Sequence, residues 1–386
     1  MQNFEFYNPT KIIFGKNNLA KIGKEASKYG KKALLVYGKS SLKTTGVFEQ
    51  IAEALKENGI EFVEFGGVQP NPLVSHARAG IDLAKKEKVD LIIGAGGGSV
   101  LDEAKAIAMG AACEDDIWDI MQGQKRATAA LPVLTILTVA ATGSEMNNCF
   151  VLTEDETHFK AACFNNLVFP KASILDPTFT TTLPLEYTAF AAADIFSHLT
   201  EGYFTQKEDT LLQDGLVEAE VRTIIESMRI LIADSKDYTA RANMMWAATL
   251  GWNGLLNSGI GRYATPCHML GHPLSGHYDL AHGASLSIVT PKWLREKAKT
   301  EPRRIANFFR RIFGTSFADD ATCAEEGIQA LETWYKEIGT PLTMKEAGVQ
   351  TPDLNTLAAS AHKLAKSWGM KDFSEEYIRA FYEKCI

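Results

Sequence analysis

The sequence predicts an α/β protein in which an N-terminal parallel sheet, with helices on both faces, is followed by an all-helical C-terminal domain. In the first half, short apolar runs such as Lys32–Tyr37 (KALLVY) alternate with amphipathic segments, as buried parallel strands joined by helices do. From about Pro184 onward only helical periodicity remains. This change of pattern predicts an α/β domain over residues 1–180 and a helical domain over residues 181–386.

Each element follows from its local pattern. Strands are expected where apolar, β-branched or aromatic residues cluster, and helices where apolar residues recur with a period of 3.6. The predicted strands are Lys32–Tyr37, Glu61–Phe65, 89–94, 132–139 and 172–176, with helices at 45–58, 73–88 and 99–112. Two further runs, 149–153 and 159–164, flank the polar turn EDETH and predict a hairpin near the sheet edge. The second domain is expected to hold helices at 187–204, Leu211–Ala233, 240–256, 268–276 and 282–299.

Composition excludes several classes of function. A formal net charge of -7 argues against a broad nucleic-acid-binding surface, which needs clustered basic residues. The six cysteines form no C-x-x-C pair, which is typical of reduced cytosolic thiols. No basic segment leads into an apolar one at the N-terminus, and no apolar run reaches the length of a membrane span. We therefore expect a cytoplasmic protein with neither nucleic-acid nor membrane partners.

Two glycine-containing loops directly follow predicted strands. The first, 94–99 (GAGGGS), opens a helix, whose free N–H groups and positive dipole end suit a phosphate. Consecutive glycines allow a sharp turn and a close approach to a ligand, although a tight strand-to-helix turn without a ligand would need them too. The second loop, 138–145 (TVAATGSE), supplies the hydroxyls of Thr138 and Thr142; a capped helix start is its alternative reading.

Histidines and one aspartate indicate a metal site in the helical domain. Asp194 and His198 are four residues apart, on one face of a predicted helix with apolar neighbours. A divalent cation would satisfy this pair, and so would a direct Asp–His hydrogen bond in the core. Four of the eight histidines, His268, His272, His277 and His282, then fall within fifteen residues, which favours a metal or proton-transfer site. Spacing alone does not choose the ligands among them.

Taken together, these motifs resemble the iron-dependent (group III) alcohol dehydrogenases over nearly the whole chain. The resemblance rests on GGGSVLDEAK, TVAATGSEM, ASILDP, the D-x-x-x-H pair and HMLGHPLSGHYDLAHG. The segments DIWDI and YDLAHGASLSIVTPKW are most similar to the butanol dehydrogenase and NADPH-dependent aldehyde reductase branch. The resemblance implies a dehydroquinate synthase-like fold, a homodimer, and an active site between a dinucleotide-binding domain and a metal-binding domain.

The resemblance also implies roles for individual residues. Asp194, His198, His268 and His282 would hold one divalent metal, Fe²⁺ or Zn²⁺, with His272 beside it as a proton relay. Asp102 would lie near the nicotinamide and is the second candidate catalytic residue. The residues expected to bind the cofactor are Gly38, Ser40, Ser41, Asn71, Gly97, Gly98, Ser99, Asp102, Thr138, Thr142 and Lys160.

The segment after the first predicted strand bears on the choice of cofactor. NAD-preferring members tend to carry an aspartate there to hold the ribose hydroxyls, whereas this chain has Gly38, followed by Lys39, Ser40 and Ser41. Without an aspartate carboxylate at this position, the 2′-phosphate of NADP(H) is not repelled, and the lysine and serine side chains can donate hydrogen bonds to it. We expect NADP(H) in preference to NAD(H).

The predicted function is hydride transfer between NAD(P)(H) and a small primary alcohol or aldehyde, such as butanol and butanal. The metal would act as a Lewis acid on the substrate oxygen. Three alternatives stay open: a zinc-dependent polyol dehydrogenase of the glycerol type, a dehydroquinate synthase-like lyase, and a non-catalytic protein that binds nucleotide and metal.

Overall fold

The computed structural model describes residues 1–207, 209–316 and 319–386, and contacts group these residues into two compact units. The sheet unit contains residues 7–182 and 248–253. The helical unit contains residues 1–6, 183–247 and 254–386. Helix α9, Tyr238–Gly251, begins in the helical unit, and its residues from Ala248 onward group with the sheet unit.

The sheet unit is built on six parallel strands. Their order is β1-β8-β5-β4-β2-β3. Strand β1 was not expected from the sequence, because it is only four residues long and Ile13 is its one buried residue. The strands are β1 Lys11–Phe14, β2 Lys32–Tyr37, β3 Glu61–Phe65, β4 Leu91–Gly96, β5 Val133–Leu137 and β8 Ala172–Leu175.

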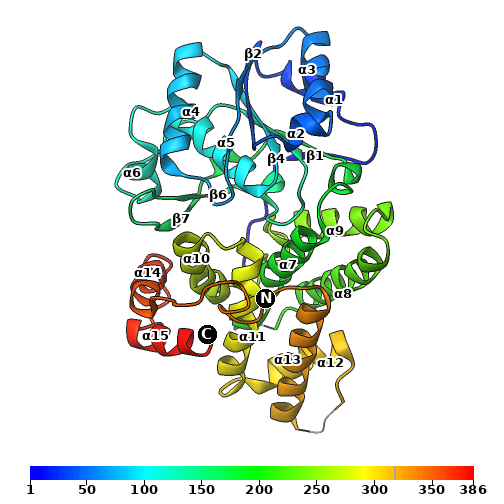
Figure 1. The fold of residues 1–386 in the computed structure, drawn as a ribbon, viewed down its shortest axis with the longest axis vertical. Helices are drawn as coiled ribbons and strands as arrows, with labels where there is room; N and C mark the ends of the chain where they lie inside the picture. Colours follow the sequence, from blue (N-terminus) through cyan, green and yellow to red (C-terminus); the bar gives the residue numbers. More distant parts are fainter. Residues whose placement is uncertain (208, 317–318) are drawn as a thin grey trace. The chain divides into compact units, whose positions relative to one another are not determined.

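Helices cover both faces of this sheet (Figure 1). On one face, the apolar side chains of α1 (Lys21–Ala26) and α3 (Val47–Glu57) join alternate residues of the strands in one buried cluster. On the other face, α5 (Gly98–Ala111) packs so closely that a Cβ at Gly94 of β4 would come 2.9 Å from the Ala104 Cβ. Helix α4 (Val74–Glu87) packs beside α5. Burial on both faces explains why the strands read as nearly continuous apolar runs.

The predicted hairpin forms from β6 (Cys149–Thr153) and β7 (Lys160–Phe164), which make a separate two-stranded antiparallel sheet. It does not join the six-stranded sheet as an edge pair. The reason lies in α5, whose Asp102 accepts a hydrogen bond from the Val151 backbone and whose Lys105 donates one to the Cys149 carbonyl. The remaining short helices are α2 Ser41–Thr44, α6 Ile117–Met121, η1 Ser144–Met146, η2 Asn166–Val168 and η3 Pro177–Thr180.

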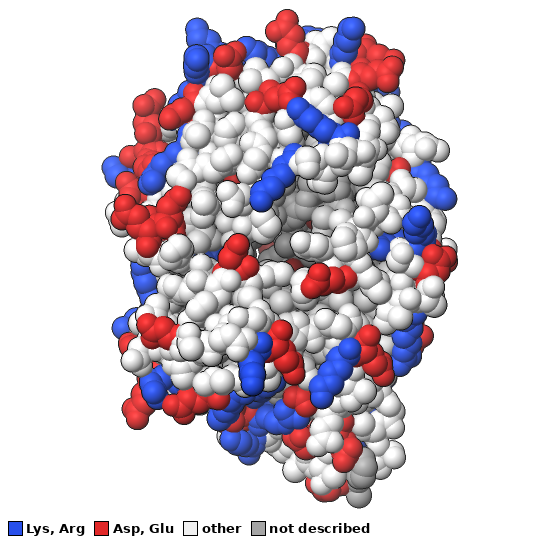
Figure 2. Space-filling view, viewed as in Figure 1, with Lys and Arg blue, Asp and Glu red and all other residues white. Residues whose placement is uncertain are grey.

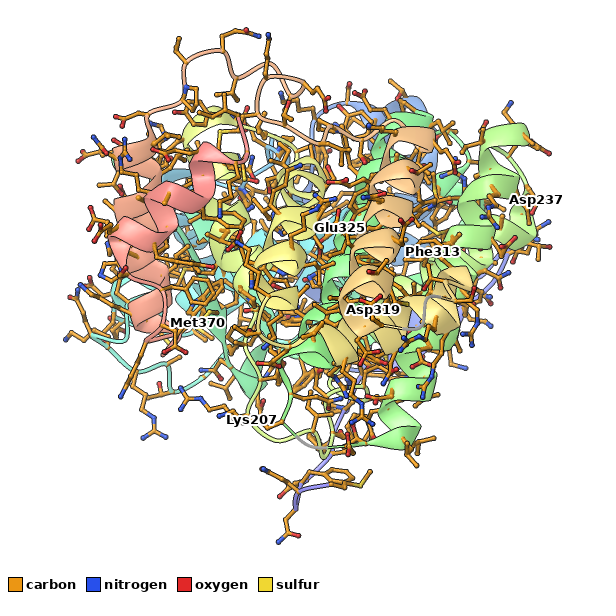
Figure 3. All side chains as sticks on the ribbon, turned by 90° about the horizontal axis from the view of Figure 1, so that it is seen from below. Lys207, Asp237, Phe313, Asp319, Glu325 and Met370 are labelled. Carbon is orange, nitrogen blue, oxygen red and sulfur yellow. The ribbon has the colours of Figure 1, made fainter. Side chains whose placement is uncertain are left out.

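The helical unit has no strand among its described residues, as the sequence predicts. Its core is an aromatic cluster in which the Phe196 ring lies 6.1 to 6.2 Å from the rings of Phe308, Trp334 and Tyr335. At the surface of this unit, Arg295 donates hydrogen bonds to Glu325 and Glu332, which lie on the same helix. Glu325 is labelled in Figure 3. Besides α9, its helices are α7 Leu185–Thr205, α8 Leu211–Ala233, α10 Pro266–Tyr278, α11 His282–Ala298, α12 Pro302–Phe313, α13 Asp320–Glu337, α14 Leu354–Ser367 and α15 Glu375–Glu383.

Charged side chains of both signs lie on the surface of the molecule. On the face shown in Figure 2, basic and acidic side chains are mixed, so this face carries no extended basic surface. Across the described ranges, no helix combines the length and the apolar character that a membrane span requires.

Candidate metal centre and nucleotide-binding loops

Asp194 and His198 form the first half of the candidate metal centre. Both lie on α7, one turn apart, and both are buried. Four-residue spacing on a helix points the two side chains to the same side. The His198 Nδ1 atom is 3.6 Å from Asp194 Oδ1.

The second half comes from α10 and α11. The Nε2 atoms of His268 and His282 lie 3.6 and 3.7 Å from the same Asp194 Oδ1 atom. One ligand atom from each of Asp194, His268 and His282 falls within 4.8 Å of the others. The His198 ring stacks on the His268 ring at 4.6 Å between centroids. The structure therefore brings together all four residues that the sequence suggests as ligands.

The close packing of α11 against α7 makes this convergence possible. Gly283 follows His282, and a Cβ added there would fall only 1.8 Å from the Phe190 carbonyl oxygen. Phe190 is one turn before Asp194 on α7. A residue with a side chain at position 283 would push the start of α11, and His282 with it, away from Asp194.

The spacing of these atoms fits a single divalent ion. In a tetrahedral site with bonds of about 2.1 Å, neighbouring ligand atoms lie about 3.4 Å apart. Separations of 3.6 to 3.7 Å are close to that value and exceed the length of a good hydrogen bond. A carboxylate with imidazole nitrogens also suits Fe²⁺ or Zn²⁺ chemically.

His272 lies beside these residues and, like His198, is not among the three residues whose ligand atoms all fall within 4.8 Å of one another. What groups His198 with the candidate ligands is its Nδ1 atom, 3.6 Å from the shared aspartate oxygen. It is buried one turn after His268 on α10, and its ring centroid is 5.3 Å from that of His282. The partly exposed Trp368 ring lies edge-on to it at 5.5 Å. His272 therefore lies next to the candidate metal centre, with the rings of His282 and Trp368 beside it.

Glu201 is a site residue that the sequence reasoning missed. It lies on α7, buried, and its carboxylate hydrogen-bonds with the His268 Nδ1 atom and with the backbone N–H groups of Cys267 and His268. Burial disfavours a charged imidazole, but Glu201 and Asp194 outweigh it and raise the pKa of His268 to about 9. The spacing D-x-x-x-H-x-x-E, which keeps all three side chains on one helical face, could have identified it.

In the sheet unit, the predicted loops meet at the carboxyl ends of adjacent strands. β2 lies between β3 and β4, so the winding of the sheet reverses between β2 and β4. Ligands of open α/β sheets bind at such a switch point. Gly38 follows β2, and a Cβ there would be 3.9 Å from Val100 of α5. Thr138 follows β5, and its N–H donates to the Gly96 carbonyl at the end of β4.

The two glycine-containing loops touch at Gly98. An added Cβ there would lie 2.4 Å from both Oγ1 and Cγ2 of Thr142. Gly97 is the N-cap of α5 and Gly98 its first residue, so the free N–H groups of the helix start lie at this contact. Gly97, Gly98 and Ser99 thus lie at the start of α5, with Thr142 against Gly98, and the first N–H groups of a helix can accommodate an anion.

Asp102, one turn into α5, has structural partners of its own. Its carboxylate accepts hydrogen bonds from Ser144 Oγ at 2.6 Å and from the Val151 N–H at 3.0 Å. Burial raises the pKa of Asp102 and lowers that of the neighbouring Lys105 to about 8. Asp102 therefore ties α5 to the second loop and to the hairpin. The sequence reasoning did not single out Lys105.

Asn71 and Lys160, distant in sequence, are direct neighbours. Lys160 Nζ donates to Asn71 Oδ1 at 2.9 Å, and both side chains are buried. Asn71 adopts a left-handed conformation, with φ of 55°, at the turn before α4. Ser40 and Ser41 are exposed at the start of α2. The residues predicted to bind the cofactor thus fall into two groups in the sheet unit. One group lies at the ends of β2, β4 and β5, and the other is the hydrogen-bonded pair of Asn71 and Lys160.

Comparison with known proteins identifies the family. The domain family described as iron-containing alcohol dehydrogenase matches residues 9–177, and its C-terminal counterpart matches residues 188–386. The chain is 38% identical to NADH-dependent butanol dehydrogenase A of Clostridium acetobutylicum, over 94% of this chain and 93% of that protein. It is 35% identical to NADPH-dependent aldehyde reductase YqhD of Escherichia coli, over 99% of both chains.

Solved structures agree with this result. The crystal structure of NADH-dependent butanol dehydrogenase A from Thermotoga maritima is 37% identical, and the two share a TM-score of 0.94. The comparison covers 100% of this chain and 99% of that one. The predicted fold class, family and class of enzyme, an NAD(P)-dependent alcohol dehydrogenase, are thereby confirmed. The chain belongs to the iron-containing alcohol dehydrogenase family.

Proposed function

We propose that this protein is a metal-dependent alcohol dehydrogenase and aldehyde reductase that acts on small primary alcohols and aldehydes, such as butanol and butanal. The observation that carries the proposal is the convergence of three histidines on one oxygen of Asp194. His198 comes from the same helix, and His268 and His282 come from two consecutive helices distant from it in sequence. The names of relatives at 35 to 39% identity support the same substrate class.

In this proposal Asp194, His198, His268 and His282 hold one divalent ion, Fe²⁺ or Zn²⁺. Such an ion supplies Lewis acidity toward the oxygen of the alcohol or aldehyde. The neutral imidazoles and the carboxylate keep the net charge of the ligands at about -1. His272 holds or releases the proton that the substrate oxygen exchanges, since its ring lies next to His282 and is not needed as a ligand.

The sheet unit would bind the nicotinamide cofactor, and we propose residues 1–180 as the dinucleotide-binding domain and 181–386 as the metal-binding domain. Gly97, Gly98 and Ser99 would bind the pyrophosphate at the start of α5, with Thr138 and Thr142 across from them. Asp102 would act near the nicotinamide and keep the second loop in place through Ser144. Asn71 and Lys160 would contact the cofactor as a pair.

Metal removal followed by turnover assays tests the function. Protein stripped with a chelator is expected to lose aldehyde-dependent oxidation of NADPH, and Fe²⁺ or Zn²⁺ should restore it, because the metal supplies the Lewis acidity toward the substrate oxygen. Butanal should be reduced much faster than glycerol is oxidised. Faster glycerol oxidation would indicate a polyol dehydrogenase, and metal-loaded protein that binds NADPH but turns over no aldehyde would be a sensor.

The choice of cofactor depends on Gly38. A Cβ there would meet the Val68 carbonyl oxygen at 3.7 Å and Val100 at 3.9 Å, both ordinary contacts, so the position has room for a Cβ. We expect the protein to prefer NADPH, and Gly38→Asp to reverse this preference, because a carboxylate repels the 2′-phosphate and accepts bonds from ribose hydroxyls. A change of about tenfold or more in relative kcat/KM is expected.

Gly38→Ala is the control for this substitution, since it adds the same Cβ without charge and should leave the preference unchanged. A wild-type enzyme that prefers NADH would contradict the proposed role of Gly38, Lys39, Ser40 and Ser41. Relatives named for NADH and for NADPH both occur at similar identity, so the measurement is informative.

We further propose that the protein is a cytoplasmic homodimer, as the family resemblance implies; light scattering tests the oligomeric state.

A further inference from the structure

Glu201 uses both of its carboxylate oxygens on the same short segment of chain. Oε1 accepts hydrogen bonds from the N–H groups of Cys267 and His268, the latter at 3.1 Å. Oε2 is hydrogen-bonded to the Nδ1 atom of the His268 ring. The side chain is almost completely buried, with 1% of the residue exposed.

The two backbone bonds place Glu201 at the start of α10, which begins at Pro266. The first N–H groups of a helix have no partners within the helix, and the helix dipole favours a negative charge there. Both N–H groups donate to Oε1, so this atom is held in a defined place. The second carboxylate oxygen then faces the His268 ring.

The bond to the ring determines which nitrogen of His268 is available for a metal. An ionised carboxylate can only accept hydrogen bonds, so Nδ1 carries the proton. The neutral ring then has its lone pair on Nε2, which lies 3.6 Å from Asp194 Oδ1. Carboxylates that bind the far side of a ligand histidine in this way orient the ring and raise its basicity.

We propose that Glu201 is a positioning residue, which holds His268 in the orientation and tautomer that bind the metal, and so sets the metal affinity of the centre. This proposal rests on the proposed metal-dependent function. The alternative is that Glu201 only caps α10 and stabilises the fold. The two differ in what happens when the carboxylate is replaced by an amide of the same size.

Glu201→Gln separates these two roles. Glutamine has one accepting oxygen, which can still cap α10, but its NH₂ group can only donate to the ring. A donor facing Nδ1 favours the opposite tautomer, with the proton on Nε2, where it blocks metal binding. Glu218→Gln is a matched control, because Glu218 is also buried in the helical unit but bonds with Tyr203 and Arg311.

The test is Zn²⁺ affinity of the full-length protein, measured by competition with a chelator, together with thermal unfolding of the metal-free protein. Glu201→Gln is expected to bind Zn²⁺ about 10- to 100-fold more weakly than wild type, and Glu218→Gln to bind it like wild type. Metal-free Glu201→Gln should unfold no more than a few degrees below wild type, since α10 stays capped. The Co²⁺ absorption spectrum should also change in Glu201→Gln alone.

Zn²⁺ affinity of Glu201→Gln within twofold of wild type would overturn the positioning role and leave the proposed function standing. If Glu201→Gln does not fold, Glu201→Asp replaces it, because the shorter carboxylate keeps the charge at α10 but cannot reach both the backbone and the ring. Its expected result is the same loss of affinity. If wild type itself binds neither Zn²⁺ nor Fe²⁺, the proposed function fails, and the role of Glu201 with it.

Discussion

His268→Ala is expected to lose the metal and the activity together. The His268 Nε2 atom is one of three imidazole nitrogens within 3.7 Å of the Asp194 oxygen, and it is the one whose ring is fixed by a second carboxylate. Alanine removes the ligand and leaves Glu201 buried without its ring partner. If the Lewis acidity of the metal stabilises the transition state by about 4 kcal/mol, its loss would lower kcat/KM by about a thousandfold. Elemental analysis of the purified variant and aldehyde-dependent NADPH oxidation measure the two effects.

His272→Ala is the matched variant, because it removes an imidazole one turn further along the same helix. It should keep its metal and lose turnover by about 10²- to 10⁴-fold, the usual range for a proton-transferring residue. A His268→Ala enzyme with full activity would end the assignment of the centre. If His272→Ala also lost the metal, His272 would be a ligand and not a proton relay.

The second large effect is expected from Gly98→Ala, which should weaken cofactor binding and leave metal binding unchanged. The added Cβ would lie 2.4 Å from the Thr142 side chain, so the two loops would have to separate. Overpacking of this kind costs about 1 to 3 kcal/mol. Since NADPH binding is proposed to need the two loops in their original contact, binding would have to meet this cost, and affinity should fall by up to about 5- to 150-fold. Fluorescence titration with NADPH measures the affinity, and elemental analysis measures the metal content.

Gly215→Ala serves as the control for this substitution. Gly215 is exposed on α8, and a Cβ there meets nothing within 4 Å. Alanine should raise the free energy of unfolding by about 0.5 to 1 kcal/mol through its helix propensity, with no change in NADPH affinity. Wild-type NADPH affinity in Gly98→Ala would show that the contact between the two loops does not form the phosphate site.

Most of the candidate centre could be predicted because its residues are grouped in sequence. Asp194 and His198 occupy one helical face, and His268, His272 and His282 fall in one short segment. Local spacing reveals such groups, but it does not show how separate helices meet. Local spacing places Glu201 on the same helical face as Asp194 and His198, but it does not show what Glu201 contacts. Its partners Cys267 and His268 are 66 and 67 residues away, and the contact exists only once α10 packs against α7.

Periodicity and glycine content are local properties of the chain, so they predict the two-part architecture, the strands from β2 onward and long helices such as α3, α4 and α5. The choice of ligand and cofactor residues came from the family resemblance. The position of β1 at the sheet edge, the separation of the β6–β7 hairpin from the main sheet, and the meeting of Asp194 with His268 and His282 could be seen only in the folded chain. These features depend on contacts between distant segments, such as Gly283 against Phe190, and such contacts follow from packing in three dimensions.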